Sequence, residues 1–135
     1  MDKALNYMAL SRKAGRIELG EEPVTAAAEA GHARLIIVAA DASEHTWRKA
    51  QSLCKNARRH CVQVPYSKDE LGQAIGRSEL AVAAFTDAAL ALAFVKALEH
   101  AELYAQVLAA LEQKNQKLQR RKGSAKTGGR NGGKK

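Results

Sequence analysis

The amino-acid sequence predicts an α/β fold, namely a three-layer α/β/α sandwich with a four-stranded mixed sheet and a C-terminal helical extension. Two observations support this fold class. Four short apolar segments have the length and composition of strands, and stretches with apolar residues at helical spacing separate them. The clearest strand lies within Arg34–Ser43, where Leu35 to Val38 are four large apolar residues, three of them β-branched. Such a run is typical of a strand buried on both faces, so we expect it near the centre of the sheet.

The first thirty residues predict a helix, an edge strand and a second helix. Apolar residues at helical spacing indicate a helix over 3–13 that ends at Gly15. A short edge strand is expected at 17–19. Gly20 then permits an unusual backbone turn, and two acidic residues and a proline suit the first turn of a helix that ends at Gly31.

The middle of the chain repeats this alternation. Asp41 or Ser43 is expected to cap a helix over 44–60. The segment 61–65 alternates like a strand and is closed by a proline. Ser67 is expected to cap the following helix.

The helix after Ser67 begins at Lys68 and breaks at Gly76, and residues 80–85 form the last predicted strand. Asp87 stands near the start of a long Ala-rich helix. In this helix small or apolar residues recur at coiled-coil-like spacing: Ala97, Ala101, Tyr104, Leu108, Leu111 and Leu118, with Asn115 in the same series. Such a helix could dock on the body, pair with another chain or form only on binding, and docking is the simplest of these.

Charge divides the chain into a nearly neutral body and a cationic tail. All 14 acidic residues lie at or before Glu112, together with 13 Lys and Arg, whereas nine positive charges and no negative one follow from Lys114 onward. Such tails contact nucleic-acid phosphates without reading sequence, although a merely solubilising tail is the simpler alternative. We therefore expect a domain over 1–98, a helical extension over 99–119 and a disordered basic Gly-rich tail over 120–135.

Several functional classes lack support in the sequence. The four histidines share no ligand spacing, and no Ser or Cys stands in a nucleophile motif, so we expect neither a catalytic residue nor a metal site nor a cofactor. Cys54 and Cys61 do not form a CxxC pair and are expected to be reduced structural thiols. The longest apolar run is far shorter than a membrane helix, and the charged start does not have the apolar segment of a signal peptide. A cytoplasmic protein with no membrane partner is the expectation.

RNA binding has better physical support. A helix that begins after Gly20 offers free backbone N–H groups to phosphate or base edges, and the loop after Gly76 offers a second polar surface. If the two loops are neighbours, they form one surface that suits recognition of a folded RNA by shape. The few aromatic residues argue against base stacking on a sheet face. The candidate RNA-binding residues are Lys13, Arg16, Gly20, Glu21, Glu22, Lys68, Gly72, Gly76, Arg77 and Ser78.

Several separated motifs resemble a known family. These motifs are the segment Arg12 to Arg16, Gly20, the segment Ala33 to Ser43 with Thr46, and the segment Glu70 to Gly76. They resemble the bacterial YlxQ-like branch of the kink-turn RNA-binding ribosomal-protein superfamily, which includes archaeal ribosomal protein 7Ae. The resemblance covers about residues 3–98.

This resemblance implies the same three-layer fold and a function in binding structured RNA, including ribosomal RNA or the ribosome, in translation. Gly20 matches the glycine that opens the RNA-contacting helix, and Lys68 matches a lysine that approaches RNA. Gly72 and Gly76 match glycines of the LGxAxG segment, and the loop after Gly76 is the one that lies against the kink.

The chain departs from the family pattern at two places. Kink-turn binders have Asn-Glu and then Lys three residues later, whereas this chain has Glu22, Pro23 and Ala26. Apolar residues expected after the second glycine are replaced by the polar segment 77–79. The chain therefore lacks the residues that read and clamp the bent RNA in that family.

Two other functions are compatible with the sequence. The chain could be a protein-interaction adaptor that acts or self-associates through its C-terminal helix. It could also present RNA to a separate modifying enzyme.

Overall fold

The computed structural model describes residues 2–55, 60–98 and 101–128 of the chain. Its elements alternate along the sequence as the α/β prediction requires. In order they are α1 (Lys3–Lys13), β1 (Ile17–Leu19), α2 (Glu21–Glu29), β2 (Leu35–Val38), α3 (Glu44–Leu53), β3 (His60–Gln63), α4 (Lys68–Ala74), β4 (Val82–Phe85), α5 (Ala88–Ala97), the 3₁₀ turn η1 (Ala101–Tyr104) and α6 (Ala105–Gly128).

The four strands form one mixed sheet in the order β1-β4-β2-β3. Strand β4 runs antiparallel to both β1 and β2, and β2 runs parallel to β3. The side chains of all four β2 residues are fully buried. The predictions that β2 lies at the centre of the sheet and β1 at its edge are therefore confirmed.

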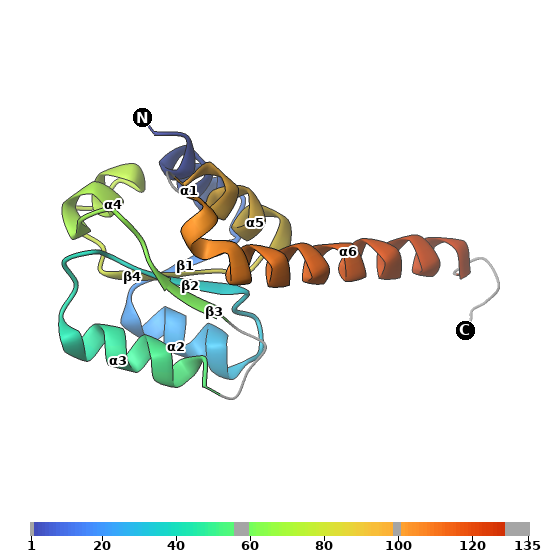
Figure 1. Ribbon diagram of the computed structural model, residues 1–135, viewed down its shortest axis with the longest axis horizontal. Helices are drawn as coiled ribbons and strands as arrows, with labels where there is room; N and C mark the ends of the chain where they lie inside the picture. The colour runs from blue at the N-terminus through green and yellow to red at the C-terminus, as the bar shows by residue number, and fades with distance from the viewer. Residues whose placement is uncertain (1, 56–59, 99–100, 129–135) are drawn as a thin grey trace.

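Helices cover both faces of the sheet (Figure 1). Helices α2 and α3 lie on one face, over a cluster that includes Val24, Ile36 and Val82. Helices α1, α4, α5 and the beginning of α6 lie on the other face, over a larger cluster. In this cluster the ring centroids of Phe85 and Phe94 are 5.0 Å apart. The three-layer sandwich that the sequence predicts is confirmed.

Side-chain caps and glycines set the element boundaries. The Ser43 hydroxyl accepts the Thr46 N–H at 3.1 Å, and Ser67 and Glu70 form a reciprocal capping box at the start of α4. Gly20 has a φ of 95°, a conformation that side-chain-bearing residues rarely adopt. These boundaries agree with the sequence prediction.

Asp41 has a different partner from the one predicted. Its carboxylate accepts the backbone N–H of Lys68 at 2.8 Å, so it satisfies the start of α4 rather than the start of α3. Ser43 alone caps α3 through its side chain. Asp41 therefore joins the loop after β2 to the helix after β3, a contact between segments far apart in the sequence.

Helix α3 is shorter than the predicted helix over 44–60. It ends at Leu53, where the Cys54 N–H donates to the Gln51 carbonyl in a tighter turn. His60 belongs to β3, because it stands in register with Leu35 of the parallel neighbour. Residues 56–59, which the prediction placed in the helix, lie outside the described residues.

The predicted long C-terminal helix is interrupted. Helix α5 ends before Leu98, whose ψ of 143° is extended, and the chain then turns back through η1 so that α6 packs against α5. Leu111 is 1% exposed within the larger core cluster, and Lys96 Nζ lies 3.8 Å from a Glu112 carboxylate oxygen. The docked alternative is confirmed, whereas a continuous coiled-coil seam is wrong.

Helix α6 also extends further than predicted. Its backbone is helical to Gly128, which includes residues 120–128 of the expected disordered tail. The last seven residues lie outside the described residues. Among the described helices, none is long and apolar enough to cross a membrane.

Candidate nucleic-acid interface

The two predicted polar loops emerge at the same end of the sheet, which we call the loop end. It consists of Gly20–Glu22, Lys68 and Gly76–Glu79. The Gly20 N–H donates to the Val82 carbonyl at 3.0 Å, and the Leu80 N–H donates to the Lys68 carbonyl at 3.0 Å. Helices α2, α3 and α4 all begin at this end, at the left in Figure 1.

Gly20 and Arg77 are direct neighbours. A Cβ atom placed on Gly20 would lie 3.9 Å from a guanidinium nitrogen of Arg77 and 3.9 Å from the Pro23 ring. Arg77 itself is exposed. The loops after β1 and α4 thus meet in space, as the prediction of a single surface required.

Arg12 also reaches the loop end. Gly76 has a φ of 77°, and a Cβ atom there would lie 3.4 Å from a guanidinium nitrogen of Arg12. In the sequence, Arg12 is simply one of the last residues of the helix predicted over 3–13. Its proximity to Gly76 depends on the packing of α1 against α4, for which the local sequence pattern gives no signal.

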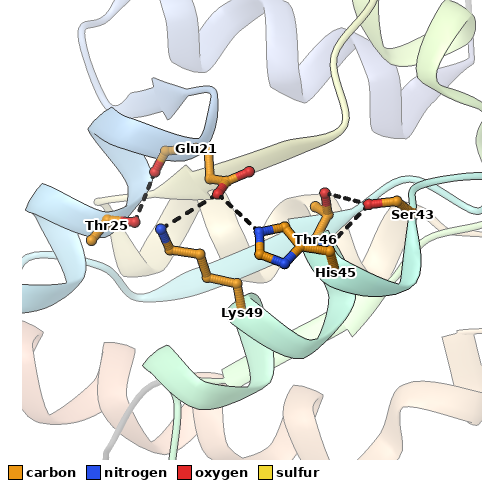
Figure 2. Close-up of polar contacts among 6 residues, drawn as sticks. All are labelled: Glu21, Thr25, Ser43, His45, Thr46 and Lys49. Atoms are coloured by element: carbon orange, nitrogen blue, oxygen red, sulfur yellow. Dashed lines mark hydrogen bonds and ion pairs between the residues drawn. The ribbon is translucent and has the colours of Figure 1, made fainter.

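Glu21 links the start of α2 to α3 (Figure 2). Its carboxylate lies 3.4 Å from Lys49 Nζ and 3.8 Å from His45 Nε2, and its carbonyl accepts the Thr25 hydroxyl at 2.8 Å. Lys49 and His45 therefore stand beside the loop end, although neither is among the candidate residues predicted from the sequence. Because Glu21 is paired with them, its carboxylate offsets positive charge at this surface.

Lys68 lies beside the loop after α4. Its Nζ is 4.0 Å from a Glu79 carboxylate oxygen, and its side chain is half-buried. Ser78 is exposed in the same loop, and Glu22 is exposed in the first turn of α2. The structure thus brings Lys68, Glu22 and Ser78 to one end of the sheet.

Gly72 is buried and has an architectural part in this surface. A Cβ atom there would lie 2.6 Å from the Glu79 Cα and 2.9 Å from the Arg77 carbonyl oxygen, closer than real Cβ contacts allow. The Arg77 N–H also donates to the Gly72 carbonyl at 2.8 Å. The absence of a side chain lets the loop after Gly76 cross directly over α4.

Arg16 lies apart from the loop end. Its carbonyl accepts the Thr86 N–H at 2.9 Å, at the end of β1 opposite Gly20, and its side chain is exposed there. Lys13, also exposed, is the last residue of α1, three positions before Arg16. Arg16, although a candidate RNA-binding residue, therefore does not lie at the start of α2, because the whole length of β1 separates it from Gly20.

The loop end has no constellation suited to catalysis. Within residues 2–55, 60–98 and 101–128, no group of three or more His, Cys, Asp or Glu side chains could hold a metal ion. Cys54 and Cys61 are not joined in a disulfide and lie on the α3 side of the sheet. A hydrogen bond with Cys54 lowers the pKa of Cys61, although burial opposes this effect.

Comparison with known proteins identifies related chains. Residues 2–92 match the model of the ribosomal protein L7Ae/L30e/S12e/Gadd45 family. The RNA-binding protein YlxQ of Enterococcus faecium is 33% identical over 75 residues, which are 56% of this chain and 72% of that protein.

Two solved structures have the same fold. A Bacillus halodurans protein described as of unknown function has a TM-score of 0.64 and 26% identity, over 83% of this chain and 99% of that one. The Giardia lamblia 15.5kD RNA binding protein has a TM-score of 0.61 and 23% identity, over 82% of this chain and 86% of that one. The second likeness shows the fold alone.

Proposed function

The chain belongs to the ribosomal protein L7Ae/L30e/S12e/Gadd45 family, and from this membership we propose that it is a non-catalytic RNA-binding protein that recognises structured RNA through the loop end. The related protein from Enterococcus faecium is named an RNA-binding protein, which supports the proposal. The neighbouring positions of Gly20 and Arg77 are the observation that carries it, because they join two loops into one surface.

The chemistry of the loop end suits an RNA backbone held in a defined shape. The first N–H groups of α2 have no partner within the helix and point out of its start, where the helix dipole favours an anion. Arg77 can donate several parallel hydrogen bonds to one phosphate. Lys68 adds a second cation at the base of the loop. Backbone donors and a few cations recognise the path of a folded RNA rather than its base sequence.

The residues that differ from the kink-turn pattern set the expected specificity. Pro23 has no N–H to donate, and Glu22 places a negative charge in the first turn of α2, next to the proposed phosphate position. Ala26 provides no cation one turn further on. We therefore propose a preference for bent or folded RNA over plain duplex, with weaker discrimination than a surface with the Asn-Glu pair and its lysine.

The proposal extends to partners and to the tail. Ribosomal RNA or another structured RNA in translation is the proposed ligand, and a cytoplasmic location stays a prediction. The cations from Lys114 onward are proposed to add phosphate contacts that weaken as salt rises.

Binding measurements with the full chain test the proposal. We would measure the Kd for a kink-turn RNA and for a plain duplex of equal length at moderate salt, for the wild type and for R77A/K68A. Loss of two phosphate contacts is expected to weaken binding to the folded RNA about tenfold. The matched control is R48A/K55A, which removes two exposed cations of the α3 region that are not part of the loop end. Equal affinity of the wild type for both RNAs would refute shape recognition by this surface.

A further inference from the structure

A cavity of about 290 Å³ lies at the other end of the sheet, between the starts of β2 and β3 and helix α6. We call it the strand-start pocket. Most of its lining residues are cations or polar groups around one buried leucine. They include Arg34, His60, Leu111, Gln113, Lys114 and Lys117.

The backbone fixes the position of the strand-side residues. The Arg34 N–H donates to the Phe85 carbonyl at 2.8 Å, and His60 stands in register with Leu35, the first residue of β2. Both side chains are half-buried. Their positions therefore depend on the sheet rather than on a surface loop.

Helix α6 provides the other wall. Leu111 is 1% exposed and anchors the helix in the core, while Lys114 and Lys117 follow one and two turns later on the pocket side. The nearby acidic residue Glu112 pairs with Lys96, and no acidic residue is among those that line the pocket in the described part of the chain. The lining is thus positive where the loop end is mixed in charge.

We propose that the strand-start pocket binds phosphate groups of an RNA backbone, as a second RNA contact remote from the loop end. A guanidinium forms paired hydrogen bonds to phosphate oxygens, lysines neutralise its charge, and an imidazole N–H can donate a further bond. The volume is at the lower limit of ligand pockets and suits one or two phosphate groups rather than a whole folded segment.

The pocket contacts a different stretch of RNA from the one at the loop end. The strands between the two surfaces span about 13 Å at the usual rise per residue, and the surfaces lie at opposite ends of them. Lys114 and Lys117 lie beyond the residues that match the family model, and five of the seven described lining residues come from outside that match. The assignment of the phosphate to RNA rests on the proposed RNA-binding function, whereas the phosphate site itself does not.

A residue-resolved titration of the full chain tests the pocket. Inorganic pyrophosphate is added to the ¹⁵N-labelled protein, and the amide signals of Arg34, His60 and Leu111 are expected to shift more than those of Gly20 and Gly76. The variant R34Q/K117Q is expected to bind pyrophosphate about tenfold more weakly, because it loses two of the phosphate-binding cations. The control R48Q/K55Q removes equal charge elsewhere and is expected to bind as the wild type does. Equal weakening in both variants, or no shift at the pocket, would overturn the phosphate site.

An RNA arm separates the sources of phosphate. A kink-turn RNA is expected to shift the pocket signals as well, and R34Q/K117Q is expected to weaken its affinity about threefold to tenfold. Pyrophosphate binding with unchanged RNA affinity of R34Q/K117Q would overturn the assignment to RNA and leave a small phosphate compound as the ligand. Absence of RNA-induced shifts at Gly20 and Gly76 would instead refute the proposed function of the loop end, whatever pyrophosphate does at the pocket.

Discussion

The two ends of the sheet, both proposed to bind phosphate, differ in the groups that they offer to it. The loop end consists of backbone groups and short loops, where Glu79 partly neutralises Lys68 and Glu21 partly neutralises the adjacent Lys49 of α3. The strand-start pocket consists of long cationic side chains with no acidic lining among the described residues. Surfaces of the first kind discriminate by shape, whereas surfaces of the second kind add affinity that depends on salt. Their difference therefore predicts separable contributions to specificity and affinity.

The largest effect is expected when α6 loses its anchor. L111A deletes a fully buried side chain and is expected to lower the free energy of unfolding by about 3 kcal/mol. If α6 serves mainly the pocket, pyrophosphate affinity falls in this variant while the preference for folded RNA persists. Thermal unfolding and the two binding assays measure this. L118A, half-buried further along α6, is the control and is expected to cost less than about 1 kcal/mol.

A smaller loss of stability is expected at Gly72. G72A introduces a methyl group against the backbone of Glu79 and Arg77, which cannot give way as a side-chain tip could. Overpacking of this kind costs about 2 kcal/mol, and displacement of the loop should abolish the preference for folded RNA. Unfolding in urea together with RNA binding measures both effects.

G31A separates this clash from backbone strain. Gly31 has a φ of 79°, but no atom lies within 4 Å of the position that a methyl group would take, so its substitution costs about 1 kcal/mol from the backbone alone. An RNA preference that survives in G72A at full stability would contradict the architectural explanation of the loop end.

Salt dependence distinguishes the tail and the pocket from the loop end. Replacing Lys126, Arg130, Lys134 and Lys135 with Gln is expected to reduce the slope of log K against log salt by about 3, and R34Q/K117Q by about 1 to 2. Neither change should alter the ratio of affinities for folded and duplex RNA. A changed ratio with an unchanged slope would show that these cations read shape rather than supply charge. Filter binding at several salt concentrations provides the slopes.

The sequence predicted those features of the fold that residues adjacent in the chain determine. Local composition predicted the buried strand β2, the start of helix α2 directly after Gly20, and the cap at Ser67. All three were confirmed. The contact between Gly20 and Arg77 needed the strand order, which brings β1 beside β4, so the sequence allowed it only as a condition.

The pocket end could not be predicted for a related reason. An Ala-rich segment favours helix throughout, so no residue signalled the break at Leu98 that turns α6 back onto α5. Without that turn, Lys114 and Lys117 belong to a tail rather than to a cavity wall. Arg34 and His60 each stand next to the start of a strand, a pattern visible in the sequence but meaningful only once the parallel pairing of β2 and β3 is known.

The smallest expected effect concerns Cys61 and tests whether the pocket is confined to one face of the sheet. Cys61 follows His60 in β3, yet it packs with the cluster under α3, on the other face from the one against which Leu111 is buried. Because the Cys54 hydrogen bond lowers the pKa of Cys61, more thiolate is present near pH 7.5 than an ordinary cysteine would have. C54A is therefore expected to raise that pKa and slow alkylation of Cys61 by iodoacetamide about twofold to fivefold at pH 7.5.

The difference between C54A and the wild type should vanish above both pKa values, since each thiol is then fully ionised. Saturating pyrophosphate should leave the alkylation rate of the wild type unchanged, because its proposed site lies on the α6 side of β3. A slower alkylation of Cys61 in the presence of pyrophosphate would show that phosphate binding changes the environment of Cys61 across β3. The pocket would then not be confined to one face of the sheet.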